Sequence, residues 1–321
     1  MDNIFRVLVI SVLVASFAPA ASASPGERSE EWYVRTADNS VDLYVLERGT
    51  GAPVVVLHGG FGAEHSYLLP SFEGLEDEFR FISYDQRGSL RSPGNPDTIS
   101  IEQHVDDLEA VRMAIGIERL TLYAHSMGTH LALHYLKKYP DRVGAMILVG
   151  AMPIQSGVHL DPSLLPAINA ASAEVRSFLG RPQVAEELAK LGCELEACSP
   201  RDATRAWRIS FAAANIFHVD RWREVRGGRA FYNPVAAQAA ADTFSNDYDF
   251  VPAVTAHPFS ITVINGSHDF ADFGGVWFGP FASSNPRIHY TMLPDAGHNA
   301  WIDQPLQFEA ALRIGLQRSL P

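Results

Sequence analysis

The fold of this 321-residue chain is decided by the segment Leu120-Thr121-Leu122-Tyr123-Ala124-His125-Ser126-Met127-Gly128. Its first four residues are mostly apolar and predict a short buried strand. A run of helical period follows over 129–138. A strand, a sharp turn that carries a serine and a helix, in that order, form a nucleophile elbow, which presents the serine hydroxyl at the edge of a sheet. Ser126 is therefore our candidate nucleophile.

The turn restricts the residues around the serine. Side chains at positions 124 and 128 would collide with the adjacent backbone, so both residues must be small. Gly128 meets this requirement, and Ala124 replaces the usual glycine as a mild departure.

The sequence on both sides of this segment alternates between strand and helix patterns. Short apolar runs that end in polar or glycine-rich corners predict buried parallel strands, and helical periodicity separates them. The clearest helix covers 100–115, where Ser100 and Gln103 form a capping-box pattern. We therefore predict an α/β fold with a doubly wound, mostly parallel sheet. The predicted strands are a hairpin within 31–48 around Asp38-Asn39-Ser40, then 53–57, 79–84, 120–123, 145–149, 259–265 and 288–293, and an amphipathic helix over 305–316 follows them.

A long segment interrupts this alternation. Residues 153–257 are rich in alanine, arginine and aromatic residues and contain no convincing strand. We predict a mostly helical cap, or lid, over 153–257, inserted into a core made of 24–152 and 258–321. Its aromatic residues either line a substrate pocket or form the core of the cap itself. They are Trp207, Phe211, Phe217, Trp222, Phe231 and Tyr232.

Two later residues complete the chemistry that Ser126 needs. Serine is a poor nucleophile, so a histidine must take its proton and a carboxylate must hold that histidine in the right tautomer. Asp269 follows the strand 259–265 and His298 follows the strand 288–293, where α/β sheets build their sites. The chain order Ser, Asp, His is the one expected after such an elbow. We predict His298 as the general base and Asp269 as the carboxylate that orients it.

Attack on a carbonyl group creates an oxyanion, which backbone N–H groups must stabilise. One donor is expected from Met127, directly after the nucleophile. The other is expected from the glycine-rich corner His58-Gly59-Gly60-Phe61-Gly62, where missing side chains let the backbone approach the substrate. We predict Gly60 as this second donor, with Phe61 as the alternative.

Composition excludes several other functions. The net charge of -12 leaves no basic surface for nucleic acid or for an anionic membrane. The two cysteines, Cys193 and Cys198, lack the further ligands of a zinc site, and in an exported protein they predict a local disulfide. We therefore expect no metal and no nucleic-acid partner, and the sequence leaves the oligomeric state open.

The N-terminus predicts export. Arg6 precedes an apolar run over 7–17, and the small residues Ala21-Ser22-Ala23 follow. This layout is typical of a secretory signal peptide over 1–23, cleaved after Ala23 and leaving a mature protein without a membrane anchor in the periplasm or the medium.

Other polar groups are given structural roles. His130 and His134 lie one helical turn apart, but the glutamate of a zinc-protease helix is missing between them. His125 is expected to face away from Ser126. Asp85 and Arg87, in Asp85-Gln86-Arg87-Gly88, are expected to tie a loop together.

With His58-Gly59-Gly60-Phe61-Gly62, Asp85-Gln86-Arg87-Gly88-Ser89, the serine elbow, Gly266-Ser267-His268-Asp269 and Gly297-His298 in register, the chain resembles the proline iminopeptidase branch of the α/β-hydrolases. The likeness spans nearly the whole of the chain after residue 23. It implies an eight-stranded core, a helical cap, and removal of an N-terminal residue, typically proline, from a short peptide without a metal or a cofactor.

The chain departs from that branch in three places. Phe61 replaces a proline, the elbow reads Ala-His-Ser-Met-Gly rather than Gly-Gly-Ser-Trp-Gly, and the cap lacks the acid that follows a Trp-x-x-Trp pair. That acid binds the substrate amine, and a charged amine in a closed site needs such a partner. The cap acids that could replace it are Asp220, Glu224, Asp242, Asp247 and Asp249.

Three functions are therefore consistent with the sequence. The first is a serine hydrolase that cleaves an ester or peptide bond through an acyl-enzyme, as an iminopeptidase does. The second is a carboxylesterase or lactonase with a small apolar substrate and the same catalytic groups. The third is a non-catalytic binding protein on the same scaffold.

Overall fold

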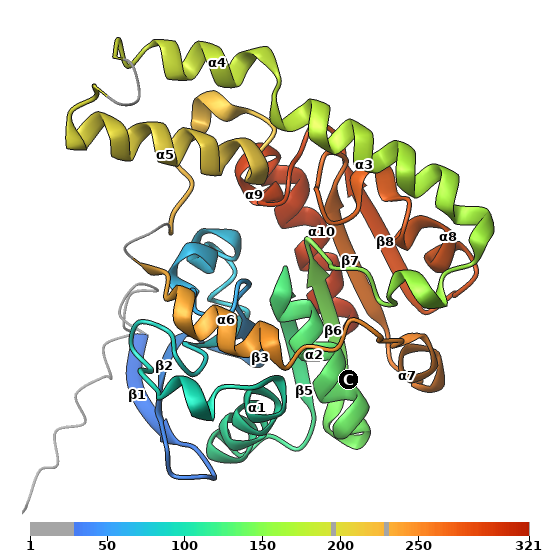
Figure 1. Ribbon diagram of the computed structural model, residues 1–321. Coiled ribbons are helices and arrows are strands. Elements are labelled where there is room, and N and C mark those ends of the chain that lie inside the picture. The colour runs from blue at the N-terminus through green and yellow to red at the C-terminus, as the bar shows by residue number, and fades with distance from the viewer. Residues whose placement is uncertain (1–28, 194–196, 228–230, 321) are drawn as a thin grey trace, which may run out of the picture.

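The computed structural model describes residues 29–193, 197–227 and 231–320, which form an eight-stranded sheet flanked by helices (Figure 1). The strand order is β1-β2-β4-β3-β5-β6-β7-β8. The first two strands run antiparallel to their neighbours, and all pairings from β4 to β8 are parallel. The strands are β1 (Ser29–Arg35), β2 (Asp42–Gly49), β3 (Ala52–Leu57), β4 (Phe79–Tyr84), β5 (Leu120–His125), β6 (Val143–Val149), β7 (Ile261–Gly266) and β8 (Ile288–Leu293).

Helices cover both faces of the sheet. One face packs against α1, α2, α7 and α8 through a cluster that includes Leu108, Leu131 and Phe278. The other face packs against the short 3-10 helix η2 (His65–Ser71), α5, α9 and α10 through a cluster that includes Leu68 and Phe308. The α-helices are α1 (Ile101–Ile115), α2 (Met127–Lys138), α3 (Leu165–Leu179), α4 (Pro182–Ala189), α5 (Pro200–Asn215), α6 (Pro234–Asp242), α7 (Val251–Ala256), α8 (Phe278–Ser283), α9 (Ala300–Asp303) and α10 (Pro305–Arg318).

The predicted α/β class and the eight-stranded sheet are confirmed, with small shifts at the ends of elements. The strands predicted over 79–84 and 288–293 have those bounds, whereas the strand predicted over 259–265 begins two residues later, at Ile261. Ser100 caps α1 as expected, because its Oγ accepts a hydrogen bond of 3.2 Å from the backbone N–H of Gln103. The N-terminal hairpin pairs β1 with β2 and turns at Asn39, where φ is 60°.

The segment predicted as a helical cap lies between β6 and β7 and contains α3 to α7 (Figure 1). In Figure 1, α4 and α5 project beyond the sheet, and α6 lies against the core. Ala236 and Ala240 of α6 pack on Phe61, and Val254 of α7 belongs to the main core cluster, so the last part of this segment packs as part of the core. The predicted disulfide is confirmed within the cap, where Cys193 and Cys198 are bonded with a Cα–Cα distance of 5.2 Å.

Within the described part of the chain, no helix is long and apolar enough to cross a bilayer. The predicted signal peptide, 1–23, lies outside the described residues.

Candidate active site

Ser126 occupies the sharp turn between β5 and α2. Its backbone has φ 55° and ψ -127°, a conformation that costs free energy in a residue with a side chain and that persists only where the surroundings enforce it. A Cβ atom on Gly128 would lie 2.5 Å from the carbonyl oxygen of Leu57, so a side chain there would push β3 away. The turn is therefore the nucleophile elbow that the sequence predicts.

Asp269 and His298 meet although 29 positions separate them in the chain. Asp269 follows β7, His298 follows β8, and these strands are parallel neighbours, so the loops after them lie at the same edge of the sheet. His298 Nδ1 is 2.8 Å from Asp269 Oδ1, and both side chains are buried. The histidine donates this hydrogen bond because a carboxylate can only accept, which leaves Nε2 as the basic nitrogen.

The carboxylate of Asp269 has few partners. Its Oδ1 also accepts a hydrogen bond of 2.8 Å from the backbone N–H of Ala271, and its Oδ2 is buried without a hydrogen-bond partner among the described residues. A buried carboxylate that is so weakly solvated strongly favours a positive charge beside it. Asp269 is therefore placed to stabilise the imidazolium that forms when His298 accepts a proton.

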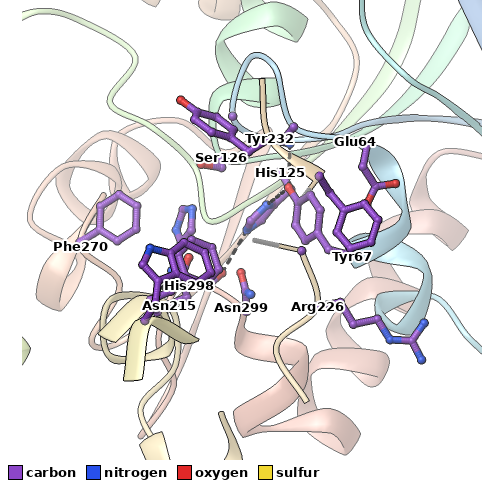
Figure 2. Close-up of a pocket in the computed structure, with 17 residues that line it drawn as sticks. Glu64, Tyr67, His125, Ser126, Asn215, Arg226, Tyr232, Phe270, His298 and Asn299 are labelled. Atoms are coloured by element: carbon purple, nitrogen blue, oxygen red, sulfur yellow. Dashed lines mark hydrogen bonds between the residues drawn. The ribbon is translucent and has the colours of Figure 1, made fainter. Parts of the chain in front are cut away.

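Ser126 and His298 line one pocket (Figure 2). Among the described residues, no hydrogen bond joins Ser126 Oγ to the His298 imidazole. Catalytic hydrogen bonds are often long in an enzyme without substrate and shorten when substrate binds. Ser126, Asp269 and His298 therefore lie at one site. The hydrogen bond between the serine and the histidine would form when substrate binds.

The glycine-rich corner after β3 also reaches the site. A Cβ atom on Gly59 would lie 2.5 Å from the Cβ of Ser126, so only glycine allows this approach. Gly60 lines the pocket with a φ of 65°. Met127 is the first residue of α2, and the first N–H groups of a helix have no acceptor within the helix. The predicted oxyanion donors, Gly60 and Met127, therefore lie on the two segments that flank Ser126.

The prediction that His125 faces away from Ser126 is wrong. His125 lines the same pocket as Ser126, and the centre of its ring lies 4.6 Å from the ring centre of His298. The strained turn at Ser126 breaks the alternation of side chains along the strand, so a rule based on a regular strand fails at this position.

The pocket has a volume of about 310 Å³. The aromatic residues that line it are Tyr67, Trp207, Phe211, Phe231, Tyr232 and Phe270. Trp207 and Phe211 of α5 stack with a ring separation of 5.2 Å on one side, and Phe270 lies over the His298 ring at 4.3 Å on another. The aromatic residues of the cap thus divide between the two predicted roles. Trp207, Phe211, Phe231 and Tyr232 line the pocket, whereas Trp222 is buried in a core cluster and Phe217 packs against Phe178 and His268.

The cap acids considered as amine anchors do not line this pocket. Glu224 forms an ion pair with Arg221, and Asp247 lies 2.5 Å from His159. Asp242 accepts a hydrogen bond from Gln238, Asp249 from the N–H of Val251, and Asp220 lies in a separate hollow beside Trp222.

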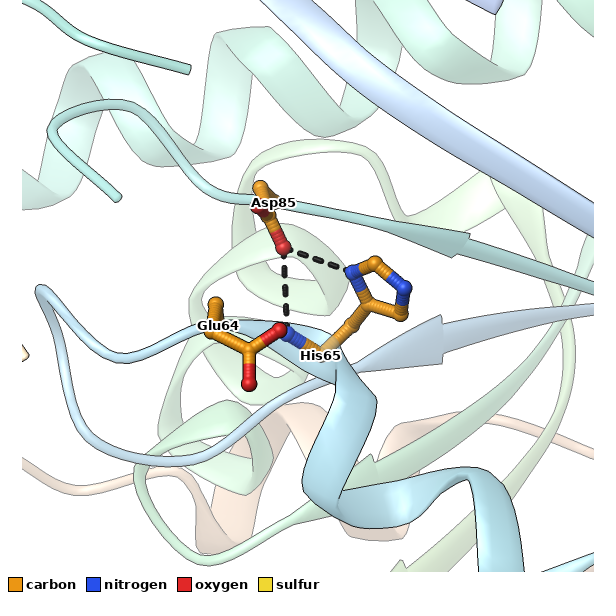
Figure 3. Close-up of side chains that lie close together, drawn as sticks. All are labelled: Glu64, His65 and Asp85. Atoms are coloured by element: carbon orange, nitrogen blue, oxygen red, sulfur yellow. Dashed lines mark hydrogen bonds and ion pairs between the residues drawn. The ribbon is translucent and has the colours of Figure 1, made fainter. Parts of the chain in front are cut away.

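Among the residues that the structure describes, Glu64 is the one acid that lines the pocket, and it is already paired. Its carboxylate lies 3.0 Å from Arg91 and accepts hydrogen bonds from Ser66. Glu64, His65 and Asp85 bring ligand atoms close enough for a metal ion (Figure 3). However, Asp85 accepts bonds of 2.6 Å and 3.0 Å from the ring and the backbone N–H of His65, and it also contacts Arg91. These contacts tie the glycine-rich loop to the end of β4.

The lowered pKa of Asp85 supports this structural role. Burial alone would raise the pKa of Asp85, but the hydrogen bonds and charge of His65 outweigh burial and lower that pKa to about 2. Arg87 makes two bonds, of 2.7 Å and 2.6 Å, to the buried carboxylate of Asp107, as expected for residues that hold a loop.

His130, set aside as a metal ligand, has a structural role. Its ring stacks on Phe244, and its Nε2 lies 2.8 Å from the carbonyl oxygen of Pro153. Burial lowers its pKa to about 4, so the ring is neutral near pH 7.

Comparisons with known proteins concern the fold of the chain. Residues 52–305 match the family model described as the alpha/beta hydrolase fold. A protein named "Putative carbamate hydrolase RutD" from Enterobacter cloacae is 36% identical over 100 residues, which is 31% of this chain and 38% of that protein. The match thus spans well under half of that relative's own length.

Two solved structures share the fold over most of the chain. The proline iminopeptidase of Mycobacterium smegmatis has a TM-score of 0.64 and 21% identity, and the match covers 90% of this chain and 99% of that one. A thermophilic esterase from Thermogutta terrifontis has a TM-score of 0.61 and 22% identity, with 90% and 99% covered. At these identities the likeness concerns the fold.

Proposed function

The chain belongs to the alpha/beta hydrolase family, and from that premise we propose that it is a serine hydrolase that cleaves small apolar esters through an acyl-enzyme on Ser126. One observation carries the proposal. A serine held in a strained elbow shares a pocket with a histidine whose other nitrogen is bonded at 2.8 Å to a buried carboxylate.

The first half of the reaction acylates the serine. His298 Nε2 takes the proton of Ser126 Oγ as the oxygen attacks the ester carbonyl. The carbonyl oxygen becomes an oxyanion between the N–H groups of Gly60 and Met127, each of which contributes roughly 3 kcal/mol to the transition state. Collapse of this intermediate breaks the bond to the alcohol, which leaves with the proton from His298.

The second half regenerates the enzyme. A water molecule gives a proton to His298 and attacks the acyl group, and Ser126 Oγ then leaves and recovers that proton as the carboxylic acid departs. Asp269 keeps the imidazole in the required tautomer and stabilises its charged form in both halves.

The pocket favours an ester over the peptide that the resemblance implies. A peptide substrate of an iminopeptidase carries a charged N-terminal amine, which needs an acid in a closed site. The five cap acids lie elsewhere, and Glu64 is engaged by Arg91 and Ser66. An apolar acyl or alcohol group instead gains from burial against Trp207, Phe211 and Phe270.

The substrate class is tested by comparing short p-nitrophenyl esters with proline p-nitroanilide on the purified protein. We expect turnover of the esters and none of the anilide. Faster cleavage of the anilide would restore iminopeptidase activity as the better assignment and would require Glu64 to bind the amine.

The catalytic assignment is tested with Ser126→Ala. This change should lower kcat by roughly a million-fold without unfolding the protein. A fluorophosphonate probe should label the wild type and not the variant. A folded wild type that resists the probe would favour the non-catalytic binding protein.

We also propose that the protein is exported, with removal of 1–23. The Cys193–Cys198 disulfide supports this, because such bonds persist in oxidising compartments. The mature N-terminus, measured by mass spectrometry on protein from the periplasm and the medium, should be Ser24. An intact Met1 in all fractions would contradict export by cleavage.

A further inference from the structure

A chain of hydrogen bonds links the glycine-rich loop to the His298 backbone through two side chains to which the reaction above gives no role (Figure 2). The backbone N–H of Gly59 is 2.7 Å from the hydroxyl of Tyr67, and that hydroxyl is 2.7 Å from His125 Nδ1. His125 Nε2 is 3.2 Å from the backbone carbonyl oxygen of His298. Dashed lines in Figure 2 mark the contacts that join Tyr67, His125 and His298.

The groups at the two ends of the path fix which atom donates and which accepts in every bond. The Gly59 N–H can only donate and the His298 carbonyl can only accept. His125 must therefore carry its proton on Nε2. In a neutral imidazole, Nδ1 is then an acceptor, so the Tyr67 hydroxyl accepts from Gly59 and donates to His125.

The surroundings keep the ring of His125 neutral. Its side chain is 2% exposed, and it packs edge-on against Tyr67 and Trp301 with ring separations of 5.5 Å and 5.0 Å. Burial, reinforced by the neighbouring His298, lowers its pKa well below the ordinary value of 6.5. Burial also raises the pKa of Tyr67, so its hydroxyl keeps the proton that it donates.

The path ends at the oxyanion loop and at the catalytic histidine, and acyl transfer requires these two parts to keep a fixed position relative to each other. Gly59 directly precedes the proposed oxyanion donor Gly60, and His298 is the proposed base. They come from different loops, after β3 and after β8, whose strands are not neighbours in the sheet. A shift of about 1 Å between such groups can lower a rate about a hundredfold.

We propose that Tyr67 and His125 are positioning residues that hold the oxyanion loop and the catalytic histidine in register during acyl transfer. This role rests on the proposed serine-hydrolase function. Neither side chain exchanges a proton with the substrate, and both act through the backbone groups that they bind.

A protonated His125 would change the path. Nδ1 would become a donor, so the Tyr67 hydroxyl would lose the acceptor of its own proton. A positive ring would also lie 4.6 Å from the ring of His298, which must itself become positive. The titratable groups that face His125 are Tyr67 from η2 and His298 from the loop after β8, and the charged side chains that line the same pocket are Glu64 and Arg226.

The test is Tyr67→Phe, which removes the hydroxyl and keeps the ring. We expect kcat on a p-nitrophenyl ester to fall roughly tenfold with KM nearly unchanged. We also expect the acid limb of the kcat–pH profile to move to higher pH, because His125 Nδ1 is then free to accept a proton. A loss of structure alone would lower kcat by the same factor at every pH.

Tyr123→Phe is the matched control. Tyr123 is fully buried in β5 and donates a hydrogen bond of the same length, 2.7 Å, to Ser71 Oγ, outside the pocket. It should lower the melting temperature at least as much as Tyr67→Phe while leaving kcat and the pH profile unchanged.

Fluorophosphonate labelling of the wild type separates the two proposals. If the wild type is labelled and turns over ester, but Tyr67→Phe matches it within twofold at every pH, the positioning role is overturned and the serine hydrolase stands. If the wild type is neither labelled nor active, the proposed function fails and this role fails with it. Should Tyr67→Phe not fold, His125→Gln replaces it, and a wild-type kcat in that variant overturns the proposal.

Discussion

Gly150→Ala should disable the site while leaving the fold largely intact. Gly150 follows β6 and has a φ of 54°. A Cβ atom built on it would lie 2.8 Å from His298 Nδ1, 2.9 Å from His298 Cε1 and 3.1 Å from His125 Nε2. One methyl group would therefore press on both imidazole rings.

The size of the effect follows from these distances. Ordinary contacts of a Cβ atom begin near 3.4 Å, so the His298 ring must retreat by about 0.6 Å. That movement strains its 2.8 Å bond to Asp269 and turns Nε2 away from Ser126. We expect kcat to fall about 10- to 100-fold, which corresponds to roughly 1.4 to 2.7 kcal/mol in the barrier.

Backbone strain must be separated from this contact. A left-handed φ costs a residue with a side chain roughly 1–2 kcal/mol wherever it occurs. Gly116 has a φ of 71° at the end of α1, and a Cβ atom there would meet nothing within 4 Å. Gly116→Ala should therefore lose similar stability and keep wild-type kcat.

The assay is kcat and KM on a p-nitrophenyl ester for both variants, with urea unfolding to correct for the folded fraction. Gly150→Ala should fall well below Gly116→Ala in kcat per folded molecule. Equal kcat values in the two folded variants would refute the reasoning, because the His298 ring would then not need its present position.

Three further changes test other parts of the structure. Asp269→Asn should lower kcat by about 10⁴-fold in a folded protein, since an amide no longer holds the reactive tautomer or stabilises the imidazolium; a loss under tenfold, measured on the same ester, would remove Asp269 from the site. Arg87→Ala should cost roughly 3–5 kcal/mol in urea unfolding, because the buried carboxyl group of Asp107 loses its partner, and kcat per folded molecule should not change; a cost under 1 kcal/mol would contradict this. Acidification from pH 7 to pH 5 should lower the free energy of unfolding, since burial lowers the pKa of His104 to about 3 and of His130 to about 4, below the unfolded value of 6.5. The contribution of each ring is then present above pH 6.5 and lost below it, by about 2 kcal/mol for each ring. Burial raises the pKa of Asp107 and of Asp272 to about 6, so each of these carboxyls offsets about 1 kcal/mol; a melting temperature that rises on acidification would contradict this sign.

Much of the fold could be predicted because its signals are local. Buried strands such as β3 and β6 are apolar runs between polar corners, and the residues that form the cap of α1, Ser100 and Gln103, lie within four consecutive positions. The candidate site residues were found for the same reason. Ser126, Asp269 and His298 each follow a strand, and parallel neighbours bring such positions together without further information.

The pocket could not be predicted in the same way. Tyr67 and Glu64 belong to no chemical motif, and they reach the pocket because η2 packs beside the elbow. The direction of the His125 side chain cannot be read from strand periodicity, because it depends on the strained turn at Ser126. The five cap acids were all plausible from sequence, and only the packing of the cap helices places them outside the pocket.

The sequence by itself determined the class of the fold, the order of the candidate catalytic residues and the edge of the sheet where they lie. Each of these depends on the spacing of apolar and polar residues along one segment, which hydrophobic burial and strand geometry convert directly into structure. Tertiary structure alone decided which side chains surround Ser126 and how Gly59, Tyr67, His125 and His298 bond to one another. Those contacts join segments far apart in the chain, and their geometry comes from the packing of whole elements against each other, which no local pattern records.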